Sequence, residues 1–143
     1  MAFVDDLTVL LDTSTKIAVG SSLFKNAMPE STARAVFVHE TPGLPAVEKF
    51  GGELPAMTRP RAQVTICSTK AVGGSGIAAS TATRILAQDM WELVVGVHNE
   101  TVNGVVYQRM EPLQDVFFLR RDEAGRGVFC FNVQALRSAT TQA

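Results

Sequence analysis

The chain has 143 residues, of which 46% are apolar, and its formal net charge at pH 7 is −1. This length is typical of one domain and allows a substantial buried core, so we predict a single domain over residues 1–143. The near-neutral charge argues against a protein that binds nucleic acid through its phosphates, because such binding requires a surplus of lysine and arginine.

The N-terminal segment predicts a short helix over Val4 to Leu11. Asp5 and Asp6 suit its first turn, where the helix dipole favours negative charge. They also stand where a signal peptide would carry lysine or arginine. The sequence has no apolar run of about 18 residues, so we expect no membrane span and we expect synthesis in the cytosol. Next along the chain, Leu23-Phe24 suits either a short strand or a loop anchor.

Two predicted strands, Ala33 to Glu40 and Arg61 to Thr69, flank a long segment from Thr41 to Pro60. Both strands alternate apolar residues between two faces. The segment between them holds several helix and strand breakers, at Pro42, Gly43, Pro45, Gly51, Gly52, Pro55 and Pro60. An irregular segment of this length is unusual in a compact domain unless it is functional. We therefore predict a protruding loop or arm that contacts a partner.

A long amphipathic helix is predicted over Gly73 to Val97, with Ser75 as a possible N-cap and Gly96 at its exit. Its apolar residues follow helical spacing, at Ala78, Ala82, Ile85, Leu86, Met90, Leu93, Val94 and Val97. Polar residues occupy the opposite face, at Thr81, Arg84, Gln88 and Glu92. A helix about 30 Å long requires a sheet against which to bury its apolar stripe.

The last third of the chain predicts antiparallel strands. Asn103-Gly104 is typical of a two-residue hairpin turn. The strands are predicted at Val105 to Met110, Val116 to Arg120 and Gly127 to Leu136. The fold class is therefore α+β: a single twisted, mixed or antiparallel sheet of about four to six strands. The long helix and the short N-terminal helix pack on one face, and residues 137–143 form a flexible tail.

One segment matches a known binding motif. Gly74-Ser75-Gly76-Ile77-Ala78-Ala79 fits the dinucleotide fingerprint G-x-G-x-x-A, and Glu100 stands where a ribose-binding acid is expected. However, Ser68 to Val72 separate the motif from the preceding strand, and no second βαβ unit follows Glu100. We interpret the motif as a flexible loop. A small nucleotide-binding enzyme that uses the Gly73–Gly76 loop stays as an alternative function.

Other patterns for chemistry are sparse. His39-Glu40 and His98-Asn99-Glu100 pair histidine with carboxylate, but a metal site requires three or four converging ligands. Cys67 and Cys130 lie in predicted strands, where free buried thiols are favoured over a disulfide or a nucleophile. We therefore expect no catalytic residue, no metal and no cofactor, in a protein that is not an enzyme. Trp91, on the flank of the helix stripe, suits the core edge better than an interface.

Three stretches together resemble a known family. They read VFVHETPGLPAVEKF, RAQVTICSTKAVGGSGIAASTATRILAQ and VNGVVYQRMEPLQDVFFLRRDEAGRGVFCFNVQAL. Their order and turn chemistry, over residues 30–136, are similar to those of the minor capsid proteins, or tail terminator (tail completion) proteins, of bacteriophages with long non-contractile tails. The glycine that usually follows the Pro-Leu pair is replaced by Gln114-Asp115.

The resemblance implies a structural role. Members of this family form rings, commonly hexameric, that cap the tail tube, stop its polymerisation and join the tail to the head connector. We therefore expect a ring homo-oligomer at the tail-neck junction of a virion. Its partners would be the tail-tube protein and the head-tail connector or adaptor protein. DNA would pass through the ring without sequence-specific contacts.

A subunit of a closed ring uses two different surface patches. The first patch is predicted on the arm, at Pro42, Glu48, Lys49, Phe50, Arg59 and Arg61. The second is predicted around one charged turn, at Arg120, Arg121, Asp122, Glu123 and Arg126. This turn suits either a solvated surface or an electrostatic contact. Within the same class of protein, a head-side neck or head-completion role is the alternative.

Overall fold

A computed structural model describes residues 3–13, 23–25, 35–48, 55–67, 76–121 and 127–138. Within these ranges the chain forms two helices, α1 (Phe3–Leu11) and α2 (Gly76–Val95). The strands within the same ranges are β1 (Leu23–Lys25), β2 (Ala35–Glu48), β3 (Pro55–Cys67), β4 (His98–Val102), β5 (Val105–Pro112), β6 (Phe117–Arg121) and β7 (Gly127–Ser138).

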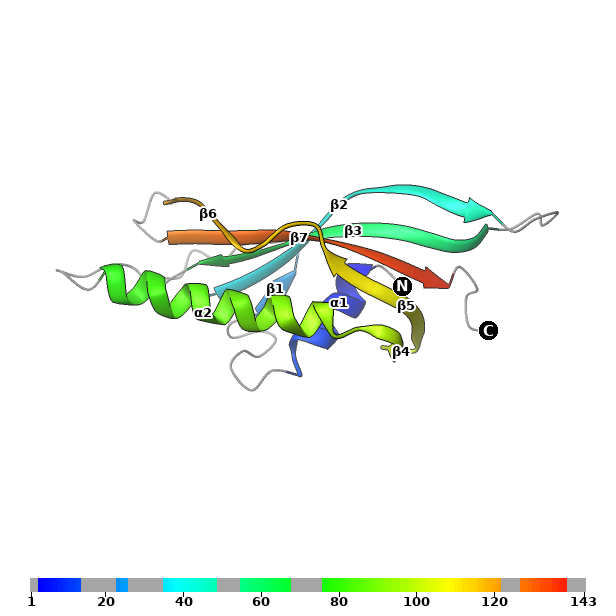
Figure 1. The fold of residues 1–143 in the computed structure, drawn as a ribbon, viewed down its shortest axis with the longest axis horizontal. Coiled ribbons are helices and arrows are strands. Elements are labelled where there is room, and N and C mark those ends of the chain that lie inside the picture. Colours follow the sequence, from blue (N-terminus) through cyan, green and yellow to red (C-terminus); the bar gives the residue numbers. More distant parts are fainter. Residues whose placement is uncertain are drawn as a thin grey trace.

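These seven strands form one sheet, in the order β1-β2-β3-β7-β5-β4, with β6 paired to β7. The pair β1–β2 is parallel, and the other pairs are antiparallel. The ribbons of β2, β3 and β7 cross in projection because the sheet is strongly twisted, and both helices lie on one side of it (Figure 1). The predicted α+β class, with both helices on one face of a twisted sheet, is confirmed.

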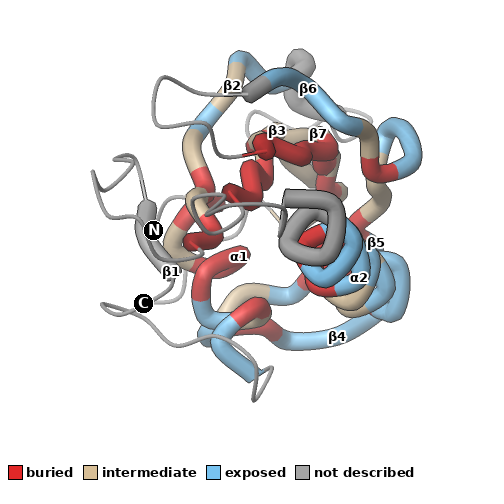
Figure 2. Tube along the Cα trace, turned by 90° about the vertical axis from the view of Figure 1, so that its left-hand side faces the viewer, coloured by how far each residue is buried: buried red, intermediate tan, exposed pale blue. Residues whose placement is uncertain are grey.

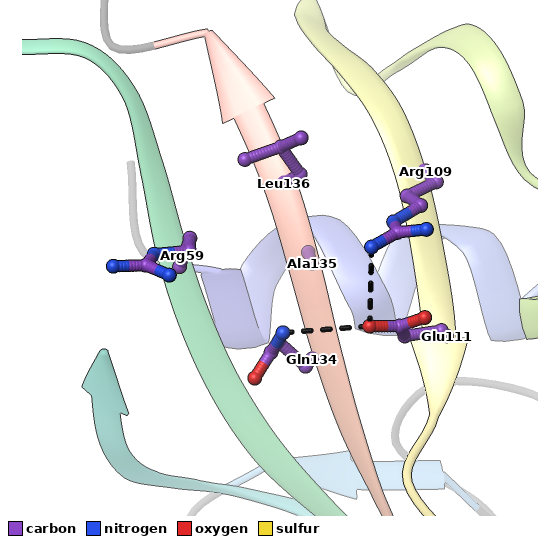
Figure 3. A pocket seen from close by; sticks show the side chains of 6 residues that line it. All are labelled: Arg59, Arg109, Glu111, Gln134, Ala135 and Leu136. Atoms are coloured by element: carbon purple, nitrogen blue, oxygen red, sulfur yellow. Dashed lines mark hydrogen bonds and ion pairs between the residues drawn. The ribbon is translucent and has the colours of Figure 1, made fainter. Parts of the chain in front are cut away.

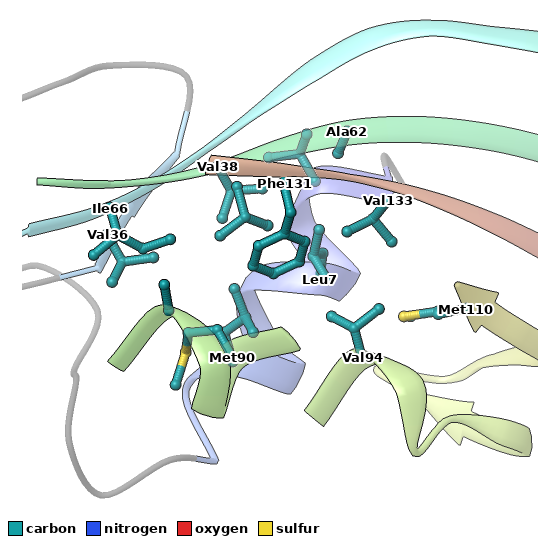
Figure 4. Close-up of a cluster of buried hydrophobic side chains, with 14 of the residues drawn as sticks. Leu7, Val36, Val38, Ala62, Ile66, Met90, Val94, Met110, Phe131 and Val133 are labelled. Atoms are coloured by element: carbon teal, nitrogen blue, oxygen red, sulfur yellow. The ribbon is translucent and has the colours of Figure 1, made fainter. Parts of the chain in front are cut away.

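The hydrophobic core lies between the sheet and the two helices (Figure 4). The largest side chains in it with less than 2% exposure are Tyr107, Phe131, Leu7, Leu11, Ile66, Met90, Met110, Val4, Val36, Val38 and Val64. Those in β2 and β3 alternate along the chain, as a sheet with one covered face requires, whereas a register shift in β5 separates Tyr107 from Met110. Complete burial of each such aliphatic or aromatic side chain stabilises the fold by about 1.5–3 kcal/mol.

The long predicted helix is confirmed, although it covers Gly76–Val95 rather than Gly73–Val97. Two residues of the predicted apolar stripe are instead exposed, Ala82 and Ile85. The buried face is centred on Met90, which is 0% exposed, and Thr83 is buried on the same face. Ile85 is five residues from Met90, which places it about 140° around the helix and directs it to solvent. The polar face at Thr81, Arg84, Gln88 and Glu92 is exposed as predicted.

β5 and β6 behave as one interrupted strand along β7. β5 pairs with the C-terminal half of β7, and β6 pairs with the N-terminal half. At the break, the Leu113 amide donates to the Asn132 carbonyl at 2.8 Å, and the Asn132 amide donates to Gln114 Oε1 at 3.0 Å. The Gln114 carbonyl accepts a hydrogen bond from Trp91 Nε1 at 3.0 Å. Trp91 therefore connects α2 to the segment between β5 and β6. It lies at the edge of the core, as was predicted in preference to an interface.

Several strand boundaries differ from their predictions. β2 and β3 extend through residues 41–48 and 55–60, which were predicted to be irregular. Residues 137 and 138 belong to β7, although they were predicted to lie in a flexible tail. Leu23-Phe24 lies in a strand, β1, rather than in a loop. In each case pairing with a neighbouring strand decides the structure, and this information is absent from the local sequence.

Asp6 of α1 is a buried carboxylate, with 0% exposure. One oxygen accepts a hydrogen bond from Asn103 Nδ2 at 3.0 Å, and the other accepts a short hydrogen bond from the Tyr107 hydroxyl. Arg137 Nη1 lies 3.6 Å from the second oxygen. Burial, together with the hydrogen bond to Asp6, raises the pKa of Tyr107 well above its ordinary value. The carboxylate therefore connects α1 to the β4–β5 turn, to β5 and to β7.

We expect Asp6→Ala to lower the free energy of unfolding by about 3–5 kcal/mol, the usual cost of removing one member of a buried ion pair. The substitution removes the acceptor that Tyr107 and Arg137 share. Urea unfolding followed by circular dichroism measures the loss. Val9→Ala on the same helix is the control, because Val9 is 44% exposed. A loss below about 1 kcal/mol for Asp6→Ala would contradict a structural role for this carboxylate.

Candidate partner interface

The face of the sheet opposite the helices carries a row of polar side chains. The strand register places Thr41, Arg61, Gln134 and Glu111 side by side across β2, β3, β7 and β5. Arg61 Nε donates to Gln134 Oε1 at 3.0 Å, and Gln134 Nε2 donates to Glu111 Oε1 at 3.4 Å. Arg109 Nη2 lies 3.6 Å from the same Glu111 oxygen. The side chains from Arg61 to Arg109 therefore form one connected polar chain over three strands.

A shallow pocket of about 230 Å³ lies beside this row. Its lining residues are Arg59, Arg109, Glu111, Gln134, Ala135 and Leu136. Figure 3 shows the pocket with α1 behind the strands, and Leu136 lies between the two arginines in this view. The Arg109 side chain is 54% exposed. Two arginines and one carboxylate line this basic pocket together with Leu136; Arg109 is paired with Glu111, and Arg59 makes an interaction of its own.

The predicted arm is a long hairpin made from the ends of β2 and β3. β7 pairs with β3 only as far as Met57, so beyond this point β2 and β3 pair only with each other among the described residues. The hairpin projects from the rest of the sheet at the right-hand end of Figure 1. Register shifts between Thr41 and Glu48 accommodate the two prolines and the glycine in this part of β2, which helped to predict an irregular segment.

Gly43 allows the two strands of the hairpin to approach closely. A Cβ at this position would lie 2.8 Å from the Arg59 carbonyl oxygen and 3.2 Å from Pro60 Cα. These are backbone atoms and cannot move aside like the end of a flexible side chain. Gly43 therefore helps to position Arg59, and hence one side of the pocket.

The structure brings together only some of the predicted interface residues. Arg59 and Arg61 lie on one face of β3, and Pro42 is exposed on β2. For Glu48 only the backbone is described, and Lys49 and Phe50 lie outside the described residues. The pocket residues Arg109, Glu111 and Gln134 were not predicted. The alternation of apolar and polar residues in these strands is typical of a sheet, but no local signal indicated that β7 and β5 follow β3 in the strand order.

The second predicted cluster lies at the other end of the sheet. Arg120 is exposed on β6, and Arg121 ends this strand, with only its backbone described. Asp122, Glu123 and Arg126 lie outside the described residues. β6 pairs with the first residues of β7, whereas the arm follows the last ones. The two predicted clusters therefore lie at opposite ends of the molecule and do not form one site.

β6 differs from the other edges of the described sheet. β1 has three residues, β2 carries Pro42 and Pro45, and Asn99 in β4 has a positive φ of 50°. Short length, proline and irregular backbone all hinder the addition of another strand. β6 has five residues and a register shift between Phe118 and Arg120, but it differs in exposing two large apolar side chains, Phe118 and Leu119, which are 46% and 45% exposed. This edge is therefore a second surface on which another chain could dock.

The structure describes some of the other features that the sequence suggested, namely the cysteines and the candidate metal ligands. Cys67 and Cys130 are buried and form no disulfide, as favoured from the sequence. The described residues contain no group of three or more His, Cys, Asp or Glu that could hold a metal ion. Among the same residues, no helix is long and apolar enough to span a membrane. The glycine-rich loop before Gly76 lies outside the described part of the chain.

Several solved structures share this fold, and two of them are described here. A chain from the virion of the native gene transfer agent particle matches with a TM-score of 0.58 and 15% sequence identity, covering 97% of this chain and 100% of that chain. A second protein, whose name describes no function, matches with a TM-score of 0.55 and 10% identity, covering 99% of this chain and 94% of that chain. No protein-family model and no curated protein matches the sequence.

We expect Gly43→Ala to lower the free energy of unfolding by about 1–3 kcal/mol, the typical cost of overpacking, because the new methyl group would press on the opposite strand. The control is Gly96→Ala, whose Cβ would lie 3.5 Å from the Glu92 carbonyl oxygen, an ordinary contact. Urea unfolding of both variants, with proteolysis to report opening of the hairpin, measures the effect. Equal stability of the two variants would show that the close approach at Gly43 is unimportant.

His39 predicts a pH dependence of stability. Its imidazole stacks on Phe37 with ring centroids 5.0 Å apart, and its buried Nδ1 has no hydrogen-bond partner. Burial lowers the pKa of His39 below its ordinary value. The unfolded chain therefore binds this proton more readily than the folded chain does. Stability is complete above the unfolded pKa, near pH 6.5, and falls as the pH drops through that value towards the folded pKa.

We expect the wild-type protein to lose more stability than His39→Phe between about pH 7.5 and 5.5. The variant keeps the aromatic stack and removes the titrating group. Thermal unfolding of both proteins in matched buffers measures the difference. Parallel pH profiles for the two proteins would contradict the assignment.

Proposed function

We propose that the chain is a structural protein of a phage-like virion and acts as a tail terminator. It would form a ring of six copies that caps the tail tube, stops its polymerisation and offers the head connector a docking face. The observation that carries the proposal is the fold shared with a chain of the gene transfer agent virion over the length of both chains. The order of motifs in the sequence supports the same assignment.

The distribution of surfaces suits a ring. A closed ring of identical subunits uses two different patches on each subunit, because every contact is head to tail. The basic pocket and the arm lie at one end of β7, whereas β6, with exposed Phe118 and Leu119, lies at the other end. A subunit with two distinct docking surfaces can therefore contact neighbours on both sides.

The arm suits contact with the tube. Beyond Met57, β2 and β3 pair only with each other among the described residues, and a two-stranded hairpin end of this kind gains stability when a partner covers it. Proline in β2 hinders strand addition along the outer edge of the arm, which leaves the faces of the hairpin for side-chain contact. We assign this contact to the last ring of the tail tube.

The test replaces residues 45–58 with an Asn-Gly turn between Leu44 and Arg59, which are paired in the native hairpin. Purified tail-tube protein is polymerised with the wild-type or the shortened chain, and tube lengths are measured by electron microscopy. We expect the wild-type chain to shorten and cap the tubes. The shortened chain should fold but leave tube length unchanged.

Circular dichroism and thermal unfolding verify that the shortened chain is folded. Capping by the shortened chain would show that the arm is not the contact. Failure of the wild-type chain to alter tube growth, with binding to a portal or adaptor protein instead, would assign the chain to the head side of the neck.

A further inference from the structure

The root of the arm, from Thr58 to Arg61 of β3, is paired irregularly on both of its edges. On the β7 side the paired positions skip from Arg61 to Thr58, and Pro60, which lies in the skipped part, has no N–H to donate. On the β2 side the register shifts between Thr41 and Val47. Backbone pairing therefore fixes the direction of the arm less firmly than a regular ladder would.

One side chain of β7 joins this root to the core. Arg137 is the cross-strand partner of Thr58, and its Nε donates a hydrogen bond to Thr58 Oγ1 at 3.1 Å. Its Nη1 lies 3.6 Å from a carboxylate oxygen of Asp6, which is completely buried. Because the guanidinium group is planar, the contacts at Nε and Nη1 have a fixed geometry relative to each other. Arg137 therefore holds the root of the arm in a set position relative to α1.

The other end of this connection is fixed inside the molecule. α1 lies within the curve of the sheet (Figure 2) and contacts β1, β2, β3 and β4. The Tyr107 hydroxyl and Asn103 Nδ2 both donate hydrogen bonds to Asp6. Taking charged groups out of water costs free energy, and only well-placed partners offset this cost. The cluster therefore favours the one arrangement of α1, β7 and the arm in which all of its members meet.

We propose that Arg137 is a positioning residue for the arm. Through Thr58 it fixes the direction in which the hairpin leaves the sheet, and so the surface that the hairpin presents to the tail tube. Its own side chain is only 19% exposed, so it acts through the arm. This inference rests on the proposed function for the identity of the partner, whereas the connection itself is a property of the single chain.

The test removes the Thr58 hydroxyl and follows hydrogen exchange of the backbone amides in the full chain. Thr58→Val keeps a β-branched side chain but cannot accept the hydrogen bond from Arg137. We expect the amides of residues 41–48 and 55–61 to exchange about tenfold faster, because a hydrogen bond from a charged donor is lost at the root. The amides of β7 residues 129–133 should keep their wild-type rates.

Three further variants sharpen the test. Thr58→Ser keeps the hydroxyl and should exchange like the wild type. Thr101→Val makes the same change as Thr58→Val at an exposed position of β4 and should leave the arm unchanged. Arg137→Lys keeps a positive charge for Asp6 but lacks the planar fork, so it should speed exchange in the arm at least as much as Thr58→Val does. The double variant T58V/R137K should then exchange no faster than R137K alone, because both changes break the same connection.

Several outcomes would overturn the inference. Unchanged arm rates in Thr58→Val would show that the hydrogen bond does not hold the arm. An equal increase over the arm and the core would show a general contribution to stability instead of a positioning role. Rates in Thr58→Ser that match those of Thr58→Val would show that the hydroxyl is not responsible. Circular dichroism establishes that each variant is folded.

The tube assay separates this inference from the proposed function. If the wild-type chain ends tube growth and Thr58→Val ends it equally well, Arg137 does not position the arm for the tube and the terminator stands. If the wild-type chain does not affect the tube but hydrogen exchange changes as expected, the connection to the arm stands and the terminator is wrong.

Discussion

The structure depends on the pairing of β7 with three other strands. One edge of β7 pairs with β3, and the other is shared by β5 and β6. Its inward residues Phe131 and Val133 are completely buried beneath the helices, whereas Gln134 and Leu136 line the pocket on the other face. A shift of β7 by one residue would exchange these two sets. The core and the candidate interface are therefore held by the same register.

The features that could be predicted are those with a local signal. The strand at Gly127 to Leu136 was predicted correctly, because alternation of apolar residues does not require knowledge of the neighbouring strand. The arm was predicted to be irregular because its prolines and glycines favour turns locally, whereas pairing with bulges decides its structure. Asp6 and Tyr107 are 101 residues apart, and no local pattern unites them. The pocket likewise depends on strand order.

Both faces of the molecule carry charges of both signs. Arg59, Arg61, Arg109 and Glu111 lie on the open face of the sheet, whereas Arg84 and Glu92 lie on the exposed face of α2. The structural role proposed here therefore rests on a fold that is also found in a virion particle, together with two separate docking surfaces at opposite ends of β7.

The most direct test of the central claim is the mass of the chain in solution, alone and after tail-tube protein is added. Light scattering at several concentrations distinguishes three cases. A monomer keeps one mass, a closed ring reaches a fixed maximum mass, and the mass of an open chain of subunits continues to increase with concentration. We expect a closed ring that binds the end of the tube. A monomer that is indifferent to tube protein at every concentration would contradict it.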